Sequence, residues 1–200
     1  MHSTHRRRIT GILLAAGKGC RFDASGTQDK LLQRLPDGDM VAVASARRMR
    51  AALANVIAVV RPEAQELVGP LRELGCDVLP CAQAGQGMAA SLVHALLAAQ
   101  DGDGWVIGLA DMPFVAPETI SALVQTIDGG ADIAAPVYQG RRGNPIAFSR
   151  EHLARLLELE GDRGARDLLE TFPVAQVSVN DPGILRDIDT REDLDAAART

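Results

Sequence analysis

The chain has 200 residues, of which 46% are hydrophobic and 24% charged, and its formal net charge is −5. This composition is that of an ordinary globular protein and excludes extensive disorder. The negative net charge argues against nucleic acid or an anionic membrane as a general partner, so a site for an anion must be a local concentration of donors. The length suits one large α/β core, and we expect residues 1–200 to form a single domain.

The N-terminal segment imitates an export signal, because arginines at positions 6–8 precede the apolar stretch Ile9 to Ala16. That stretch is short, and Lys18 and Arg21 follow it in place of a small-residue cleavage site. We therefore expect residues 1–8 to be a flexible basic tail and the protein to be cytoplasmic. No apolar run approaches the length of a membrane span.

The first half of the chain alternates β-rich runs with helical patterns. Apolar runs bounded by turn residues predict strands at 8–16, 56–62, 77–81 and 104–111. Apolar residues that recur every three or four positions predict helices over 40–54, 62–75 and 87–100. Pro62 suits the first turn of the second helix, and Gly75 suits the position after its end. This alternation predicts a parallel sheet with helices on both faces.

The second half shows a looser pattern. It predicts strands at 131–137, 144–149, 175–179 and 184–188, and helices over 150–160, 164–172 and 190–200. The sequence shows no repeats, low-complexity tract or linker. The expected fold is a three-layer α/β/α arrangement, with a mostly parallel sheet and a small antiparallel extension in the C-terminal half.

Gly17-Lys18-Gly19 directly follows the first predicted strand, and three interpretations compete for it. A Walker-type phosphate loop fails, because Gly11 lies one residue too far back and Gly19 replaces the hydroxyl residue. A dinucleotide-binding loop would need a glycine where Phe22 stands. An ordinary surface turn is the third interpretation.

Arg21 and Lys30 favour an anion site over an ordinary turn. Glycines expose backbone N–H groups and let the chain approach a ligand closely. Two fixed cations would neutralise much of a triphosphate. The arrangement therefore suits a nucleoside triphosphate better than a monoanion.

The segments LAAGKGCRF (14–22) and DKLL (29–32) resemble the signature of the MobA-like nucleotidyltransferases. Further segments resemble the molybdenum cofactor cytidylyltransferase branch, in the expected order: GQGMAASL (85–92), LADMP (109–113), RRGNPIAF (141–148) and GDRGARDLL (161–169). The resemblance covers nearly the whole chain. It implies a Rossmann-like α/β fold and an enzyme that attaches a nucleoside monophosphate to a phosphorylated acceptor and releases pyrophosphate. One departure is the insertion-like DASGTQ (23–28), which puts the shape of the triphosphate loop in question.

Asp111 and Asp189 are the candidate metal ligands. Asp111 ends a predicted strand, where ligands bind in open α/β sheets, and Mg²⁺ prefers one or two carboxylates together with phosphate oxygens. Thr190 and Asp193 form a capping box, which leaves Asp189 at the junction before the last helix. The resemblance implies that both aspartates hold the metal, and Asp187 is less favoured. The alternative is that they only cap turns or decorate a solvated helix start.

The resemblance also implies which residues contact the nucleotide: Leu14, Ala15, Ala16, Gly17, Lys18, Gly19, Arg21, Lys30, Gly85, Gly87, Met88 and Ser91. We call the segment LAAGKGCRF (14–22) the opening loop. In the resembled proteins an opening loop with Ala-Ala-Gly is found in enzymes that use CTP, and one with Ala-Gly-Gly in enzymes that use GTP, so Ala15-Ala16-Gly17 favours CTP. The implied acceptor is molybdopterin, bordered by Arg142, Asn144, Arg163 and Arg166. The alternative for these four is a solvated surface.

No residue is spaced to act as a general base. His2, His5, His94 and His152 are scattered, and the three cysteines lack CxxC spacing, so we expect reduced thiols and no zinc site. A phosphate monoester has a second pKa near 6 and needs no base to attack. What hinders attack is repulsion between anions, about 4 kcal/mol for unit charges 4 Å apart at an effective dielectric of 20. We expect Lys30, Arg21 and Asp111, with Mg²⁺, to relieve it.

The resulting hypothesis is an Mg²⁺-dependent transferase that joins CMP to molybdenum–molybdopterin, with a molybdoenzyme or its chaperone as a further partner. One alternative is the same chemistry with GTP, or with a sugar or alcohol phosphate as acceptor. Another is a non-catalytic accessory protein that binds the nucleotide or cofactor and delivers cofactor to a molybdoenzyme.

Overall fold

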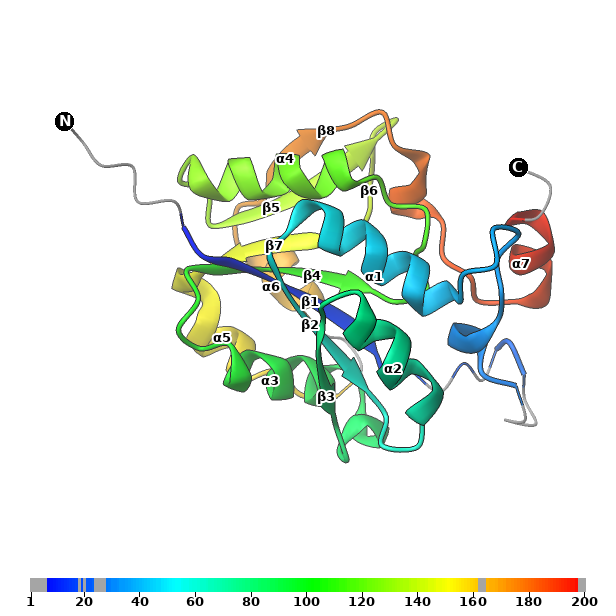
Figure 1. The fold of residues 1–200 in the computed structure, drawn as a ribbon. Helices are drawn as coiled ribbons and strands as arrows, with labels where there is room; N and C mark the ends of the chain where they lie inside the picture. The colour runs from blue at the N-terminus through cyan, green and yellow to red at the C-terminus, as the bar shows by residue number, and fades with distance from the viewer. Residues whose placement is uncertain (1–6, 18, 20, 24–27, 162–164, 198–200) are drawn as a thin grey trace.

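The strands form one mixed sheet in the order β3-β2-β1-β4-β7-β5-β6, with β8 paired to β5 (Figure 1). The computed structural model describes residues 7–17, 19, 21–23, 28–161 and 165–197. Within them the strands are β1 Ile9–Ala15, β2 Asn55–Val60, β3 Asp77–Pro80, β4 Gly104–Leu109, β5 Ile133–Tyr138, β6 Arg141–Arg142, β7 Ile146–Ser149 and β8 Ala175–Ser178. Strands β3, β2, β1 and β4 are parallel neighbours, and β7 pairs antiparallel with β4 and β5. The mostly parallel sheet with a small antiparallel part is confirmed.

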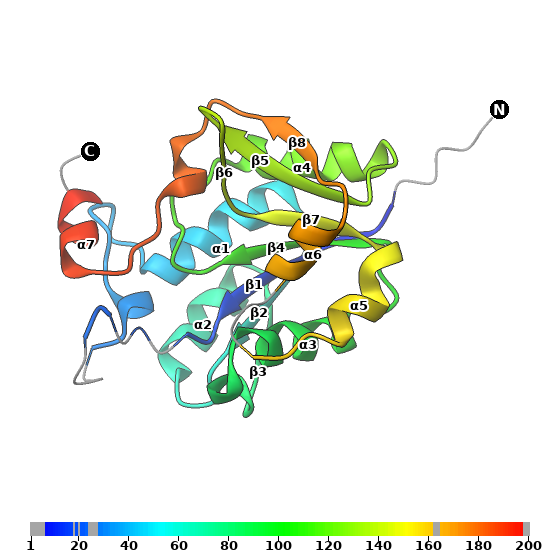
Figure 2. The same ribbon diagram turned by 180° about the vertical axis from the view of Figure 1, so that it is seen from behind.

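Helices cover both faces of this sheet (Figures 1 and 2). The α-helices are α1 Val41–Ala52, α2 Gln65–Glu73, α3 Met88–Ala98, α4 Pro117–Asp128, α5 Leu153–Leu157, α6 Arg166–Thr171 and α7 Arg191–Ala197. Short 3-10 helices are η1 Lys30–Leu32, η2 Ala84–Gln86, η3 Arg150–His152 and η4 Pro182–Leu185. None of these helices in the described part of the chain has the length and apolar character needed to cross a membrane.

Two hydrophobic cores fill the space between the sheet and its helix layers. Strand β1 shows how the sequence builds both, because its side chains alternate between the faces. Leu13 and Ala15 join the core under α1, α2 and α4, and Ile12 and Leu14 join the core over α3, α5 and α6. The continuous apolar run of β1 is therefore the mark of a strand buried on both faces.

Three predicted elements need correction. The segment 184–188 is not a strand, because Asp181 accepts a hydrogen bond from the Gly183 N–H and Pro182 starts the 3-10 helix η4. Pro62 does not begin a helix: it lies in a turn closed by the Ala64 N–H and the Arg61 carbonyl, and α2 starts at Gln65. The helix expected over 150–160 begins as η3 and ends at residue 157.

The chain start also differs from expectation. Residues 1–6 lie outside the described residues. Arg7 donates from Nη1 to the Ile127 carbonyl at 3.0 Å, and the Arg8 backbone N–H donates to Asp103 Oδ2 at 2.7 Å. Arg7 and Arg8 therefore pack against the rest of the chain and do not belong to a flexible tail.

Candidate active site

A cavity of about 460 Å³ opens where the opening loop, β4 and the start of α3 meet, beyond the carboxyl end of β1. Ligands in open α/β sheets bind at this edge, because the loops that leave parallel strands gather there. The lining residues are Leu14, Ala16, Gly17, Gly19, Arg21, Lys30, Leu31, Ala84, Gly85, Gly87, Met88, Ser91, Leu109, Asp111 and Asp189. Segments from across the chain thus meet around one space.

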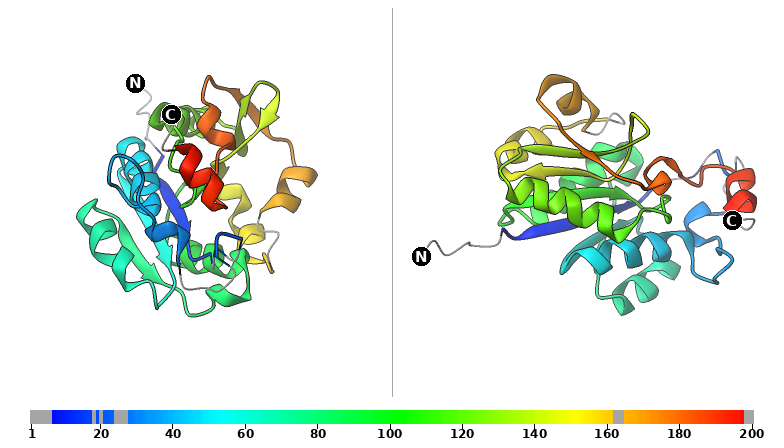
Figure 3. Two further views of the ribbon diagram at one scale, coloured as in Figure 1. Left: turned by 90° about the vertical axis from the view of Figure 1, so that its right-hand side faces the viewer. Right: turned by 90° about the horizontal axis from the view of Figure 1, so that it is seen from above.

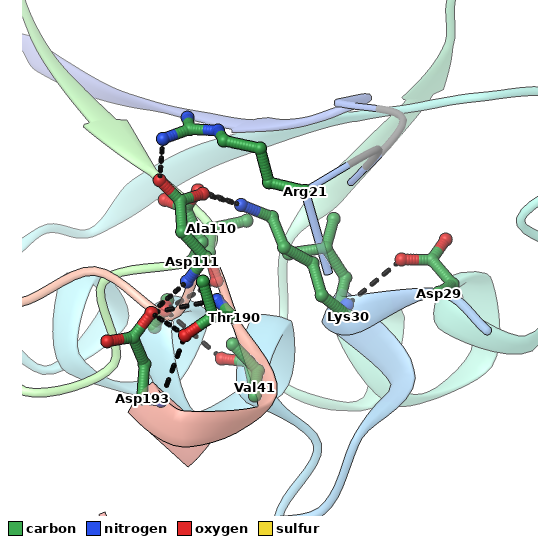
Figure 4. Close-up of polar contacts among 11 residues, drawn as sticks. Arg21, Asp29, Lys30, Val41, Ala110, Asp111, Thr190 and Asp193 are labelled. Carbon is green, nitrogen blue, oxygen red and sulfur yellow. Dashed lines mark hydrogen bonds and ion pairs between the residues drawn. The ribbon is translucent and has the colours of Figure 1, made fainter. Parts of the chain in front are cut away.

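Lys30 joins the two candidate metal-binding aspartates. Its Nζ lies 2.6 Å from Asp111 Oδ2 and 2.6 Å from Asp189 Oδ1, and Figure 4 shows the side chain extending into this cluster. Lys30 is only 6% exposed. Burial alone would lower its pKa, but the charges and hydrogen bonds of the two carboxylates outweigh burial and raise the pKa above its usual value. Lys30 therefore stays positively charged through the neutral range.

Arg21 contributes a second cation to the cluster. Its Nη1 lies 2.7 Å from Asp189 Oδ2, while most of the Arg21 side chain is exposed. Burial on its own would raise the pKa of Asp189, but Lys30 and Arg21 hold that pKa below its usual value. Partial burial raises the pKa of Asp187, and the negative charges of Asp189 and Asp111 act in the same direction. Asp189 is therefore the better anion of the neighbouring pair.

One carboxylate oxygen of Asp111 is placed to bind a cation. Its Oδ1 is buried and has no hydrogen-bond partner among the described residues. A buried carboxylate oxygen without a partner is costly, and a bound divalent ion would satisfy it. In the described part of the chain, no group of three or more His, Cys, Asp or Glu side chains gathers to hold a metal. Two carboxylates nevertheless suit Mg²⁺, which takes its remaining ligands from phosphate and water.

Hydrogen bonds to the backbone hold Asp111 and Asp189 close to each other. The Ile188 N–H donates to the Asp111 carbonyl at 2.8 Å, which fastens the C-terminal segment beside the loop after β4. Asp193 Oδ2 accepts from the backbone N–H groups of Asp189 and Thr190, at 3.1 and 2.8 Å. The predicted capping box is confirmed, because the Asp193 N–H donates back to Thr190 Oγ1 at 3.2 Å. The cap thus fixes the backbone that carries Asp189.

The other end of the cavity is less charged. Gly87 has φ +123° between η2 and α3, a conformation that favours glycine, and it lets the chain turn sharply into the helix. Met88 lies at the wall with 42% of its surface exposed, and Ser91 is buried one turn further along α3. An apolar wall with a few polar groups suits a flat heterocycle better than a phosphate.

Several predicted site residues lie elsewhere. Ala15 does not line the cavity, because side chains alternate along β1 and its methyl faces the core under α1. Lys18 and Arg163 lie outside the described residues. Arg142 is exposed on β6 and Arg166 is exposed at the start of α6, and neither lines the cavity. Asn144 lines a separate small pocket beside α1. The structure thus brings most of the residues predicted to contact the nucleotide together around the cavity, whereas Arg142, Asn144 and Arg166 do not line it.

Sequence reasoning missed other residues of this region. Leu31, Ala84 and Leu109 line the cavity beside residues that the motifs single out. Arg61 pairs with Asp29, the residue before Lys30. Arg61 directly follows β2. Its position at the carboxyl end of a parallel strand could have indicated that it lies near the site.

A cleft in which two cationic side chains and two carboxylates meet at this edge of a mixed α/β sheet is typical of nucleotide-handling enzymes. The family model of the MobA-like NTP transferase domain matches residues 11–179. The purine catabolism protein PucB of Bacillus subtilis is 30% identical over 203 residues, which cover 96% of each chain. The chain therefore belongs to the MobA-like NTP transferase family and is a nucleotidyltransferase.

Solved structures share the fold over nearly the full length. Rv0371c from Mycobacterium tuberculosis is similar with a TM-score of 0.80 and 28% identity, covering 98% of this chain and 100% of that one. A second structure of Rv0371c, in complex with manganese, has a TM-score of 0.79 at 28% identity and covers 96% and 99%. A protein similar to this chain has thus been crystallised with manganese.

Proposed function

We propose that the protein transfers CMP from CTP to the phosphate of molybdenum–molybdopterin and releases pyrophosphate, in the cytoplasm and with Mg²⁺. The observation that carries the proposal is the shared contact of Lys30 with Asp111 and Asp189 inside the cavity that the GQGM turn also lines. A molybdoenzyme or its chaperone would receive the product.

In this reaction an oxygen of the acceptor phosphate forms a bond to the α-phosphorus of CTP. The bond from the α-phosphorus to the bridging oxygen of the β-phosphate breaks, and pyrophosphate leaves with its electron pair. The acceptor is mostly dianionic at neutral pH, so no side chain has to remove a proton. Lys30, Arg21 and the backbone N–H groups of the glycine loop neutralise the triphosphate and the leaving group.

Asp111 and Asp189 would hold the cation, since they offer two carboxylates and one of them has a buried oxygen without a partner among the described residues. A bound Mg²⁺ supplies charge neutralisation at the phosphates and orients the leaving pyrophosphate. The manganese complex of Rv0371c supports a divalent cation in a related fold. The choice of Mg²⁺ is part of the proposal.

The preference for CTP is supported by the opening loop. Ala16 lines the cavity, and its methyl group takes space that a glycine would leave open. The resembled proteins with Ala-Ala-Gly use CTP, and those with Ala-Gly-Gly use GTP. A smaller pocket would favour a pyrimidine over guanine.

A thermal-shift panel of CTP, GTP, ATP and UTP with Mg²⁺ tests the nucleotide. A ligand at 100 times its dissociation constant adds about 2.7 kcal/mol to the free energy of unfolding. For a chain of this size that raises Tm by roughly 5 to 10 °C. We expect the largest shift with CTP, and stabilisation by GTP alone would overturn the cytidine assignment.

The site itself is tested by Asp111→Asn. We expect pyrophosphate release from CTP with molybdenum–molybdopterin to fall by at least about 100-fold, because the metal loses a charged ligand. Far-ultraviolet circular dichroism should show an unchanged fold. Asp128→Asn at the exposed end of α4 is the matched control and should keep wild-type turnover. Unfolding of Asp111→Asn would instead show that Asp111 is structural.

A further inference from the structure

Arg61 emerges at the same edge of the sheet as the opening loop. Strands β1 and β2 are parallel neighbours, with Ala15 in register with Val60, so Arg61 directly follows β2 beside the start of that loop. Its guanidinium forms an ion pair with Asp29 through Nη2 and Oδ2. Both side chains are largely covered, with 24% of Arg61 and 13% of Asp29 exposed. This ion pair is therefore well shielded from solvent.

Asp29 in turn supports the turn that carries Lys30. Its Oδ1 accepts from the Leu31 N–H at 2.9 Å, and its backbone carbonyl accepts from Gln33 Nε2 at 2.9 Å. The helix η1 has only three residues, and such short 3-10 turns have little stability of their own. The cap at Asp29 and the buried Leu31 side chain therefore fix the direction in which Lys30 leaves the backbone.

We propose that Arg61 is a positioning residue for nucleotide transfer, which acts by holding Asp29 and through it the turn that aims Lys30 at Asp111 and Asp189. This inference rests on the proposed function. Arg61 does not itself line the cavity, so it acts on the reaction through Lys30.

Charge explains why an arginine stands here. Without the guanidinium, a largely buried carboxylate would remain unpaired one residue from Lys30. That carboxylate would lose the contact that ties the η1 turn to the end of β2. It would also add a negative charge beside the site proposed for the triphosphate, where anions repel. The Arg61–Asp29 pair removes both effects while it leaves Asp29 free to cap η1.

The test compares Arg61→Met with Arg47→Met. Arg47 also pairs with an aspartate, Asp39 at 2.9 and 3.0 Å, but this pair is more exposed and lies outside the cavity. The probe is whichever of CTP, GTP, ATP and UTP most stabilises the wild-type chain. The dissociation constant of this nucleotide with Mg²⁺ is measured by calorimetry, and turnover is measured as pyrophosphate release with molybdenum–molybdopterin as the acceptor. We expect Arg61→Met to weaken binding by about 10-fold and turnover by about 10- to 100-fold, as a displaced catalytic group does. Arg47→Met should match the wild type.

Two further variants separate positioning from simple stabilisation. Adding Asp29→Asn to Arg61→Met removes the uncompensated carboxylate, and the asparagine can still cap η1, but the contact that holds the turn stays broken. We therefore expect only partial recovery, with turnover still at least about 3-fold below the wild type. Arg61→Lys keeps the charge and should retain more activity than Arg61→Met. The inference is overturned if Arg61→Met lowers only Tm, or if the double variant regains wild-type binding and turnover, because the contact between Arg61 and Asp29 would then not be needed.

The variant Lys30→Met distinguishes a failure of the inference about Arg61 from a failure of the proposed function. If Lys30→Met lowers turnover by about 10²- to 10³-fold while Arg61→Met behaves like Arg47→Met, only the inference about Arg61 is wrong. If Lys30→Met leaves binding and turnover unchanged, the proposed role of the cavity is wrong.

Discussion

At the scale of single residues, the site depends on one ammonium group between two carboxylates. Lys30 is nearly buried, and its charge is kept by Asp111 and Asp189. The same geometry serves the reaction, because a fixed cation stabilises charge that develops on the leaving group without needing to reorganise. Removal of Lys30 should therefore slow the reaction.

Lys30→Met is expected to lower kcat/KM by about 10²- to 10³-fold, the usual effect of losing a fixed donor to a transition-state anion. Steady-state kinetics with the preferred nucleotide measures the change. Lys30→Arg is the conservative comparison and should retain part of the rate. A loss confined to KM would contradict this role, because it would mean that Lys30 binds substrate and transition state equally.

His152 makes stability depend on pH. It is 4% exposed, packs edge-on against Phe148 and Phe172, and its Nδ1 has no partner among the described residues. Burial, helped by the charge of Arg155, lowers its pKa below the usual value of 6.5. The unfolded chain therefore takes up a proton first as pH falls, and the folded state loses stability below about pH 6.5.

We expect the free energy of unfolding of the wild type to fall between pH 7.5 and 5.5 relative to that of His152→Phe. Urea unfolding at both pH values measures the difference, and the comparison cancels groups such as Asp187 that act in the opposite direction. Equal pH dependence in the two proteins would mean that His152 does not titrate differently on folding.

At the scale of elements, Asp181 fastens the C-terminal segment to α4. It is buried and accepts hydrogen bonds from the Ala116 N–H at 2.8 Å and Thr119 Oγ1 at 2.7 Å, so it caps a helix whose own N-cap residue has no capping side chain. This contact holds the chain that continues to Asp189. A residue far along the sequence thus completes the start of α4.

Asp181→Ala should lower the free energy of unfolding by about 1 to 3 kcal/mol, because it leaves buried donors without an acceptor. Denaturant titration measures the loss. Asp128→Ala, at the exposed end of the same helix, should stay within about 0.5 kcal/mol of the wild type. Equal losses in the two variants would show that the cap contributes nothing specific.

Helices and strands with a clear local sequence pattern were predicted more accurately than those without one. The parallel strands and the helices between them carry clear periods and were predicted closely. Helix α4 was missed although Ile120, Leu123 and Ile127 recur at helical spacing after Pro117. The segment 184–188 was mistaken for a strand because it is a short run with apolar residues at 184, 185 and 188, while the turn preference of Asp181 and Pro182 decided its structure.

At the scale of the whole molecule, the fold brings the opening loop and the nearby η1 turn together with three segments that are distant from them in sequence: the turn between η2 and α3, the loop after β4, and the segment before α7. Figure 3 shows α7 beside the early part of the chain, and Arg191 of that helix donates to Gln28 at 2.7 Å. The C-terminal segment thus closes around the start of the chain and carries Asp189 to the cavity.

Most of the nucleotide set could be predicted because its motifs lie at strand ends, which the sheet gathers at one edge. What the sequence did not provide were contacts between segments with no shared motif. The pairing of Arg61 with Asp29 depends on the order of β1 and β2 in the sheet. The acceptor residues were carried over from motifs alone, and Arg142 and Arg166 are exposed outside the cavity.

The central claim is that Asp111 and Asp189 bind one divalent cation beside the triphosphate. A crystal grown with Mn²⁺ and a non-hydrolysable CTP analogue tests it most directly, because anomalous scattering locates manganese. We expect one manganese ion with carboxylate oxygens of both aspartates as ligands, at about 2.0 to 2.2 Å as for similar hard cations. Manganese bound by neither aspartate, or by only one of them, would contradict it.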